Sequence, residues 1–213
     1  RRLLMNRSVE AAVIENGASV ILGEGLAYDR CSVGIVTNIV SDEEDLSRWD
    51  TQPTGGEYYT TPRSIYRTQV DVVLPSGHAV LNAEDELVAD FAELCDGEVI
   101  FFACDATNPT LVAHLAAGKR GVTVVDKRVV LRAGADETRL SRLVDAPYIG
   151  KARQAKNIAN VLAGIAAGWA LGLSKEVMTT GMKTFGLELA DPASLILQPA
   201  KKSQPKKPAS ARK

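Results

Sequence analysis

The sequence predicts an α/β fold, with a mostly parallel sheet flanked by helices. Short apolar runs rich in β-branched or aromatic residues occupy residues 32–39, 78–82 and 98–103, as expected of buried strands. Helical patterns at residues 64–74 and 83–95 alternate with them. This alternation favours parallel strands joined by crossover helices, and the right-handed crossover rule places helices on both faces of the sheet.

The residues before and after the first of these strands, at 32–39, carry further signals. Residues 1–9 are predicted to end a helix, and the apolar run EAAVIE at 10–15 is predicted to be a buried strand closed by Asn16-Gly17. Residues 21–28 suit a short helix or a loop. Residues 40–62 are acidic and then rich in Thr, Gly, Pro and Tyr, which predicts a long exposed loop.

The second half of the sequence is predicted to form three helices and a β-hairpin. Asn108-Pro109 opens a helix that Gly118 stops, and Asp126-Lys127 is the turn between two short strands. Two more helices are predicted at 152–171 and 175–185.

We therefore expect one domain over residues 1–190 and a separate tail over residues 191–213. The tail is rich in Lys and Pro and carries no acid after Asp191. Such a segment cannot bury a core, so it is predicted to be disordered. It either keeps the chain soluble or contacts a polyanion.

Composition excludes several classes of protein. A net charge of −1 argues against a nucleic-acid partner, and no apolar run reaches the roughly 20 residues that span a membrane. Three cysteines without metal-site spacing predict reduced thiols and a cytoplasmic location. The chain starts with Arg, which we interpret as a fragment cut on its N-terminal side.

Ligands of open α/β sheets bind at the carboxyl ends of the strands, so polar residues there are the first candidates. Glu15 ends the predicted strand at 10–15 and is a candidate Mg²⁺ ligand, because hard cations prefer oxygen donors; the alternative is a solvated side chain. Thr37 and Asn38 lie at the end of the predicted strand at 32–39 and could hold phosphate or water, or form a plain turn. Glu84 and Asp85 follow a third strand, although acids there also suit a helix N-terminus.

Common catalytic motifs are absent from the sequence. It contains no GxSxG, HExxH or GxGxxG, and no P-loop pattern GxxxxGK(S/T). His78 and His114 have no Ser, Cys or metal-ligand partner nearby in sequence, so both are interpreted as structural. No catalytic residue is assigned.

Three segments in order resemble the central domain of the Mur ligases. They are GLAYDRCSVGIVTNI at residues 25–39, AVLNAED at 79–85 and KNIANVLA at 156–163. Other phrases, such as RTQVD at 67–71 and LCDG at 94–97, resemble the cyanophycin synthetases in particular.

The resemblance implies an ATP- and Mg²⁺-dependent amide ligase. Cyanophycin synthetases build an Asp-backbone polymer with Arg branches through acyl phosphates; an ATP-grasp domain adds Asp and the Mur-like domain adds Arg. It also implies that Asn157 and Asn160 lie near the nucleotide base. The implied partners are an upstream ATP-grasp domain and P-loop segment, a cyanophycin polymer or dipeptide substrate, and further copies in a homo-oligomer.

Departures from the family pattern predict that this part is not active by itself. The pattern ETxRGG reads Glu15-Asn16-Gly17-Ala18-Ser19-Val20, so only the Glu is kept. The metal-binding His expected after residues 37–39 is missing, the bridging Lys falls near Tyr66, and the third domain expected after Phe185 is replaced by the tail. These features suggest the shortened second form of the enzyme. The alternatives are a non-catalytic oligomerisation or polymer-binding domain, and a fragment of a Mur or folylpolyglutamate-type ligase.

Overall fold

The computed structural model describes residues 5–39, 62–149 and 155–186. The predicted loop at residues 40–62, except for its last residue, and the predicted tail at 191–213 lie outside these ranges.

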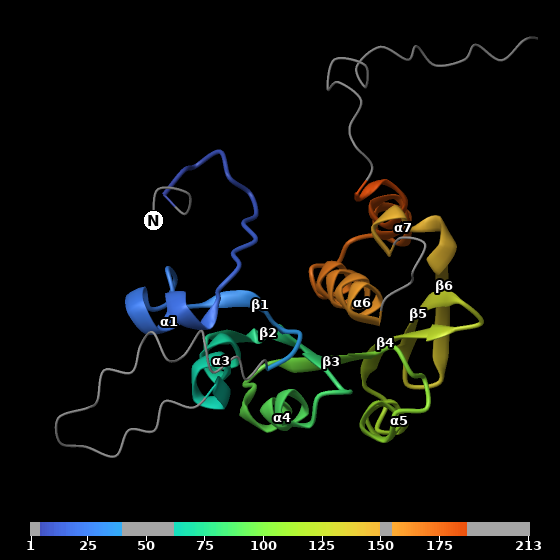
Figure 1. Ribbon diagram of the computed structural model, residues 1–213, viewed down its shortest axis with the longest axis horizontal. Helices are drawn as coiled ribbons and strands as arrows, with labels where there is room; N and C mark the ends of the chain where they lie inside the picture. Colours follow the sequence, from blue (N-terminus) through green and yellow to red (C-terminus); the bar gives the residue numbers. More distant parts are fainter. Residues whose placement is uncertain (1–4, 40–61, 150–154, 187–213) are drawn as a thin grey trace, which may run out of the picture.

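The centre of the fold is one sheet of six strands, which lie in sequence order (Figure 1). The strands are β1 (Cys31–Val36), β2 (Val73–Asn82), β3 (Glu98–Ala103), β4 (Arg120–Val125), β5 (Arg128–Ala133) and β6 (Asp136–Arg142). The pairings from β1 to β4 are parallel, and β5 and β6 are added antiparallel. The predicted fold class, an α/β domain with a mostly parallel sheet, is therefore confirmed.

Helices cover both faces of the sheet, as predicted. On one face lie the crossover helices α3 (Pro62–Asp71), α4 (Glu86–Ala89), which continues into the 3-10 helix η1 (Asp90–Leu94), and α5 (Pro109–Ala116). They share a face because each right-handed crossover steps one strand in the same direction. The long helix α6 (Ala155–Ala170) lies across the other face (Figure 1).

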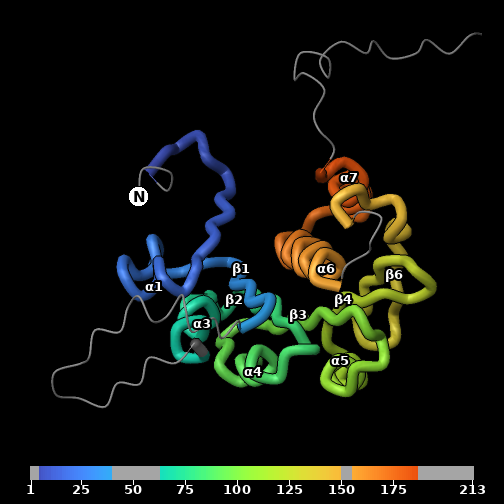
Figure 2. Tube along the Cα trace, in the orientation of Figure 1, coloured from blue at the N-terminus to red at the C-terminus, as the bar shows by residue number. Residues whose placement is uncertain are grey.

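Four shorter elements complete the fold. Helix α1 (Ala18–Glu24) packs beside α3, and α7 (Lys175–Thr184) packs beside α6 and β6. Two 3-10 turns, η2 (Leu143–Asp145) and η3 (Pro147–Ile149), lead from β6 toward α6. The tube in Figure 2 shows how α7 returns alongside α6 after a short turn.

Side chains of the central strands alternate between two apolar cores. Val80, Ile100 and Phe102 face the core under α6, where they meet Leu162 and Ala166. Leu81 and Phe101 point the opposite way, into a core with Val88, Phe91 and Leu111. A strand buried on both faces has no polar face, which explains the continuous apolar runs AVL and VIFF in the sequence.

Local signals placed several elements correctly. Asp126 and Lys127 both have positive φ, 48° and 60°, as a tight two-residue hairpin requires. The Asn108 side chain accepts from the backbone N–H of Leu111 and caps α5, and Ser174 caps α7 in the same way.

Other element predictions were wrong. Residues 10–15 form no strand: the segment is irregular, and Val13 is 94% exposed. Within the described part of the chain β1 pairs only with β2, so this apolar run has no sheet partner. Residues 5–9 form turns rather than a helix end. Val73 and Leu74 begin β2 rather than ending a helix, because Val73 is fully buried in the sheet.

The strand β6 was not predicted from the sequence. Its first four residues are exposed, and only Leu140 and Ser141 are buried. Apolar and polar residues do not alternate along this segment, so its sequence does not indicate a strand. It is recognised as a strand only by its pairing with β5.

Gly34 allows α3 to lie directly on β1. A Cβ atom there would overlap the carbonyl oxygen of Gln69 and come within 2.8 Å of Cγ2 of Val73. The backbone of α3 and the side chain of a fully buried residue leave no room to adjust.

We therefore expect Gly34→Ala to lower the free energy of unfolding by about 1–3 kcal/mol, the usual cost of overpacking. The matched control is Gly164→Ala in α6, where a Cβ meets nothing within 4 Å. There the same change should raise stability by about 0.5–1 kcal/mol, because Ala is the better helix former. Urea unfolding of both variants measures the difference. Equal stability of the two variants would contradict the close approach of α3 to β1.

Candidate functional site

The carboxyl ends of β1, β2 and β3 meet at one edge of the sheet. Val36 pairs with Leu81, and Asn82 pairs with Phe102, so these strands end at nearly the same level. The residues that follow each strand are polar: Thr37-Asn38, Asn82 with Glu84-Asp85, and Cys104-Asp105. We refer to this group as the carboxyl-edge cluster.

Asn82 ties the first two strand ends together. Its Nδ2 donates to the carbonyl oxygen of Thr37 at 2.9 Å, and its Oδ1 accepts from the backbone N–H of Glu84 at 2.9 Å. The residue is only 9% exposed. Both functional groups of a buried amide are satisfied by backbone partners, which fixes the position of Thr37 relative to β2.

The two acids of the cluster also bond to backbone groups. Asp85 accepts from the N–H groups of Leu87 and Val88 and so caps α4, while its other oxygen accepts from Ile39 at 2.9 Å. Glu84 accepts from the backbone N–H of Asp105 at 2.9 Å. Helix capping, the alternative that the sequence offered for these acids, therefore describes Asp85.

A turn after β3 extends the cluster. Asp105 accepts from the backbone N–H and the hydroxyl of Thr107, at 2.8 and 2.7 Å, and these bonds lower the pKa of its carboxyl group. Asn108 donates to the carbonyl oxygen of Ala83 at 3.2 Å. Our sequence analysis missed Asp105 as part of the site. An Asp directly after a buried strand, followed by Thr at i+2, is the signal that could have found it.

The N-terminal end of α6 lies at the same edge. The Cys104 thiol lies 3.8 Å from the carbonyl oxygen of Ala155, the first residue of α6. Burial, followed by the negative charge and hydrogen bond of Glu84, raises the pKa of Cys104 to about 12. This thiol is therefore protonated, and so unreactive, at neutral pH.

Asn157 and Asn160 lie in the first turns of α6 and both donate to Tyr148. The Asn157 amide reaches the Tyr148 carbonyl oxygen at 3.4 Å, and the Asn160 amide reaches its hydroxyl at 3.3 Å. Asn157 is partly buried and Asn160 is exposed. The structure thus places both predicted base contacts at the end of α6 that adjoins the cluster.

Thr37 and Asn38 lie at the edge, whereas Glu15 does not lie at a strand end. The Thr37 hydroxyl donates to Oδ1 of Asn38 at 3.0 Å. Glu15 is exposed, and its neighbour Asn16 donates to the Tyr28 hydroxyl at 2.8 Å. Tyr28 precedes β1, so this contact belongs to the amino-terminal side of the sheet. Roles in binding nucleotide or metal remain predictions for all these residues.

The described ranges contain no group of three or more His, Cys, Asp or Glu side chains that could hold a metal ion. They also contain no helix long and apolar enough to cross a membrane. Both histidines have contacts within the sheet: His114 stacks edge-on against Phe101 and lies 3.1 Å from the Val99 carbonyl oxygen, and His78 lies 3.7 Å from Glu98.

Comparison with known proteins identifies relatives of this chain. The chain is 33% identical over 183 residues to cyanophycin synthetase from Synechocystis sp. and 30% identical to that from Geminocystis herdmanii. Each alignment covers 86% of this chain but 20% of the relative, so the chain spans about a fifth of their length. A UDP-N-acetylmuramoylalanine–D-glutamate ligase from Desulfitobacterium hafniense is 31% identical over 73% of this chain and 29% of its own.

No family model matches the chain. A solved structure of a murein peptide ligase from Psychrobacter arcticus aligns with 74% of this chain and 28% of its own, at a TM-score of 0.47 and 12% identity.

These sequence similarities show that the chain belongs to the Mur-type, ATP-dependent ligases. Within that class, the chain belongs with a Mur-ligase-like part of the cyanophycin synthetases.

Cys104 gives a direct chemical test of the cluster. At pH 8 we expect iodoacetamide to modify it far more slowly in the native chain than in urea, because its pKa is held near 12. Glu84→Gln removes the negative charge but keeps an oxygen that can accept from Asp105, so Cys104 should react faster in this variant. Mass spectrometry of each cysteine measures the rates, with Cys95 as the internal control. An unchanged Cys104 rate in Glu84→Gln would show that Glu84 does not act on the thiol.

Proposed function

We propose that the chain is part of an ATP-dependent amide ligase that makes cyanophycin, a polymer with an Asp backbone and Arg on each side chain. The observation that carries this proposal is the similarity to cyanophycin synthetases over 86% of the chain, at up to 33% identity. The reaction class is amide formation through an acyl phosphate that an amine attacks. ATP and Mg²⁺ are its cofactors, and it takes place in the cytoplasm.

The carboxyl-edge cluster is the proposed nucleotide position. Thr37 and Asn38 supply a hydroxyl and an amide on the phosphate side, and Asn157 and Asn160 supply amides on the base side. What supports this assignment is that α6 begins beside the end of β3, within contact distance of Cys104. Ligands of parallel α/β sheets bind at this edge.

The cluster does not fit a Mg²⁺ ion by itself. The Asp85 carboxylate accepts hydrogen bonds from three backbone N–H groups, and Glu84 accepts one from the backbone N–H of Asp105. Glu15 lies apart from both. The sequence contains no P-loop to cradle phosphates. Phosphoryl transfer depends on these positioning elements, so we propose that the chain alone is inactive. It would work with an upstream ATP-grasp domain and P-loop segment, on a cyanophycin polymer or dipeptide, in a homo-oligomer.

A second candidate function is a non-catalytic scaffold within the same enzyme. The observation that favours it is that Glu84, Asp85 and Asp105 all accept hydrogen bonds from backbone N–H groups. A scaffold needs the strand ends to be fixed but needs no bound nucleotide.

Calorimetric titration with Mg-ATP separates the two candidates. We expect no binding by the chain alone, and binding by the full-length protein encoded by its gene with the ATP-grasp site disabled. In that protein Thr37→Val, which removes one hydroxyl at constant shape, should weaken binding by about fivefold, the effect of one hydrogen bond of about 1 kcal/mol.

Thr180→Val on the exposed side of α7 is the matched control and should bind as the unmodified protein does. If the full-length protein with its ATP-grasp site disabled binds no nucleotide, the ligase role of this part is wrong and the scaffold is favoured.

A further inference from the structure

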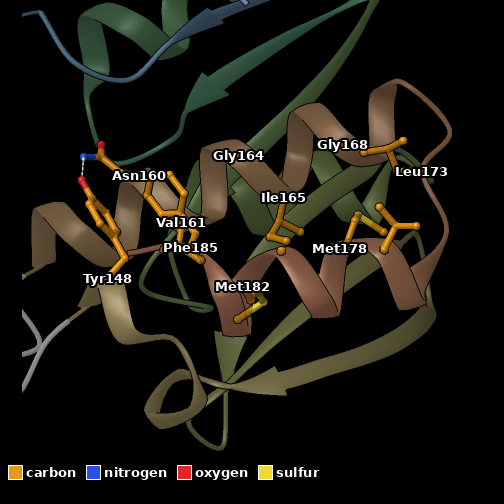
Figure 3. A pocket seen from close by; sticks show the side chains of 12 residues that line it. Tyr148, Asn160, Val161, Gly164, Ile165, Gly168, Leu173, Met178, Met182 and Phe185 are labelled. Carbon is orange, nitrogen blue, oxygen red and sulfur yellow. Dashed lines mark hydrogen bonds between the residues drawn. The ribbon is translucent and has the colours of Figure 1, made fainter. Parts of the chain in front are cut away.

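An apolar groove of about 470 Å³ runs between α6 and α7 (Figure 3). Tyr148 and Phe185 form one end of the groove, where their rings lie 5.1 Å apart. Leu173 and Met178 lie toward the other end. The polar groups at the Tyr148 end, its hydroxyl and the Asn160 amide, are hydrogen-bonded to each other.

Two glycines in the lining leave space in the groove because they have no side chain. Gly164 on α6 and Gly181 on α7 both line it, and a Cβ atom at either would meet nothing within 4 Å. The side chains at its rim are apolar and exposed: Val177 by 54% and Phe185 by 64%. Exposed apolar side chains around a concave apolar floor are typical of a surface that another segment covers.

The chain itself supplies a segment of the right kind within reach. Phe185 ends α7 inside the groove, and the sequence continues from there to Leu195-Ile196-Leu197, an apolar triplet between Pro192 and Pro199. Residues 187–194 can span up to roughly 30 Å when extended. The groove runs beside α7, whose 10 residues extend about 15 Å. The triplet can therefore reach any point along it.

Within residues 191–213, only this part of the sequence suits an apolar floor. From Ala200 onward the residues are Lys, Arg, Ser, Pro, Gln and Ala, with six basic side chains and no large apolar one. The groove and the triplet match in chemistry, and the continuous chain keeps the triplet at high effective concentration beside it.

We propose that residues 194–198 bind in the groove, with Leu195, Ile196 and Leu197 over Gly164 and Gly181, which departs from the disorder that composition predicts for residues 191–213 as a whole. This inference is independent of the proposed ligase function, because it rests only on the groove and on the sequence that follows it.

Hydrogen exchange of the whole 213-residue chain, followed by mass spectrometry, tests the proposal. Peptides covering residues 194–198 should exchange at least tenfold more slowly than those covering 203–213. Gly164→Phe should abolish this protection, because it places a large ring in the groove from a position where a Cβ atom meets nothing within 4 Å. Gly164→Ala, which adds one methyl group, should keep most of it.

Leu195→Ser with Ile196→Ser should abolish the protection without touching the folded domain. Amides of β2 and β3 must stay protected in every variant, which separates a filled groove from a failure to fold. Rapid exchange of residues 194–198 in the unmodified chain, or protection that survives Gly164→Phe, would overturn the proposal. Protection that grows with protein concentration would overturn it as well, because a second copy would then occupy the groove.

Discussion

Burial of β2 and β3 on both faces is the constraint on which the rest of the structure depends. Val80, Leu81, Ile100 and Phe102 are fully buried, and they point alternately to opposite sides of the sheet. A sheet that is buried on both faces needs a layer of helices on each side. The crossover connections fill one layer, and α6 supplies cover for the other face.

This requirement also positions the candidate site. To cover the second face, α6 runs along β2, β3 and β4, and its first residue then falls beside the end of β3. Core packing of α6 therefore also places Asn157 and Asn160, in its first turns, where both donate to Tyr148. At the same edge, Asn82 and Asp85 join strand ends, loop and helix start through backbone hydrogen bonds. The resulting cluster is rigid in its backbone, and its acids are already bonded within the protein.

The sequence predicts most of the fold because buried parallel strands and helix caps carry strong local signals. The strand at 98–103, the helix opened by Asn108 and the hairpin at Asp126-Lys127 all depend on neighbouring residues. The strand prediction at residues 10–15 was wrong, and β6 was missed, because strand formation at both places depends on pairing with distant residues rather than on local sequence. An apolar run becomes a strand only where a sheet edge pairs with it, and a polar run can become one where such a partner exists.

The candidate site was predictable only in part. Thr37 and Asn82 follow recognisable strands, so the sequence places them at the edge. The hydrogen bond from Ile39 to Asp85 joins positions 46 residues apart, and the contact between Cys104 and Ala155 joins positions 51 apart. No local pattern encodes such contacts. The sequence therefore identified polar residues at the strand ends but could not show which of them the fold already uses.

Photo-crosslinking with 8-azido-ATP tests the central claim, that nucleotide binds at the carboxyl edge of β1–β3, most directly. The full-length protein with its ATP-grasp site disabled would be irradiated with the analogue, and the labelled peptides mapped by mass spectrometry. Our account predicts labelling within residues 155–161 that excess ATP suppresses, because it proposes that the base binds beside Asn157 and Asn160. Specific labelling confined to α7, or to segments outside this chain, would contradict it.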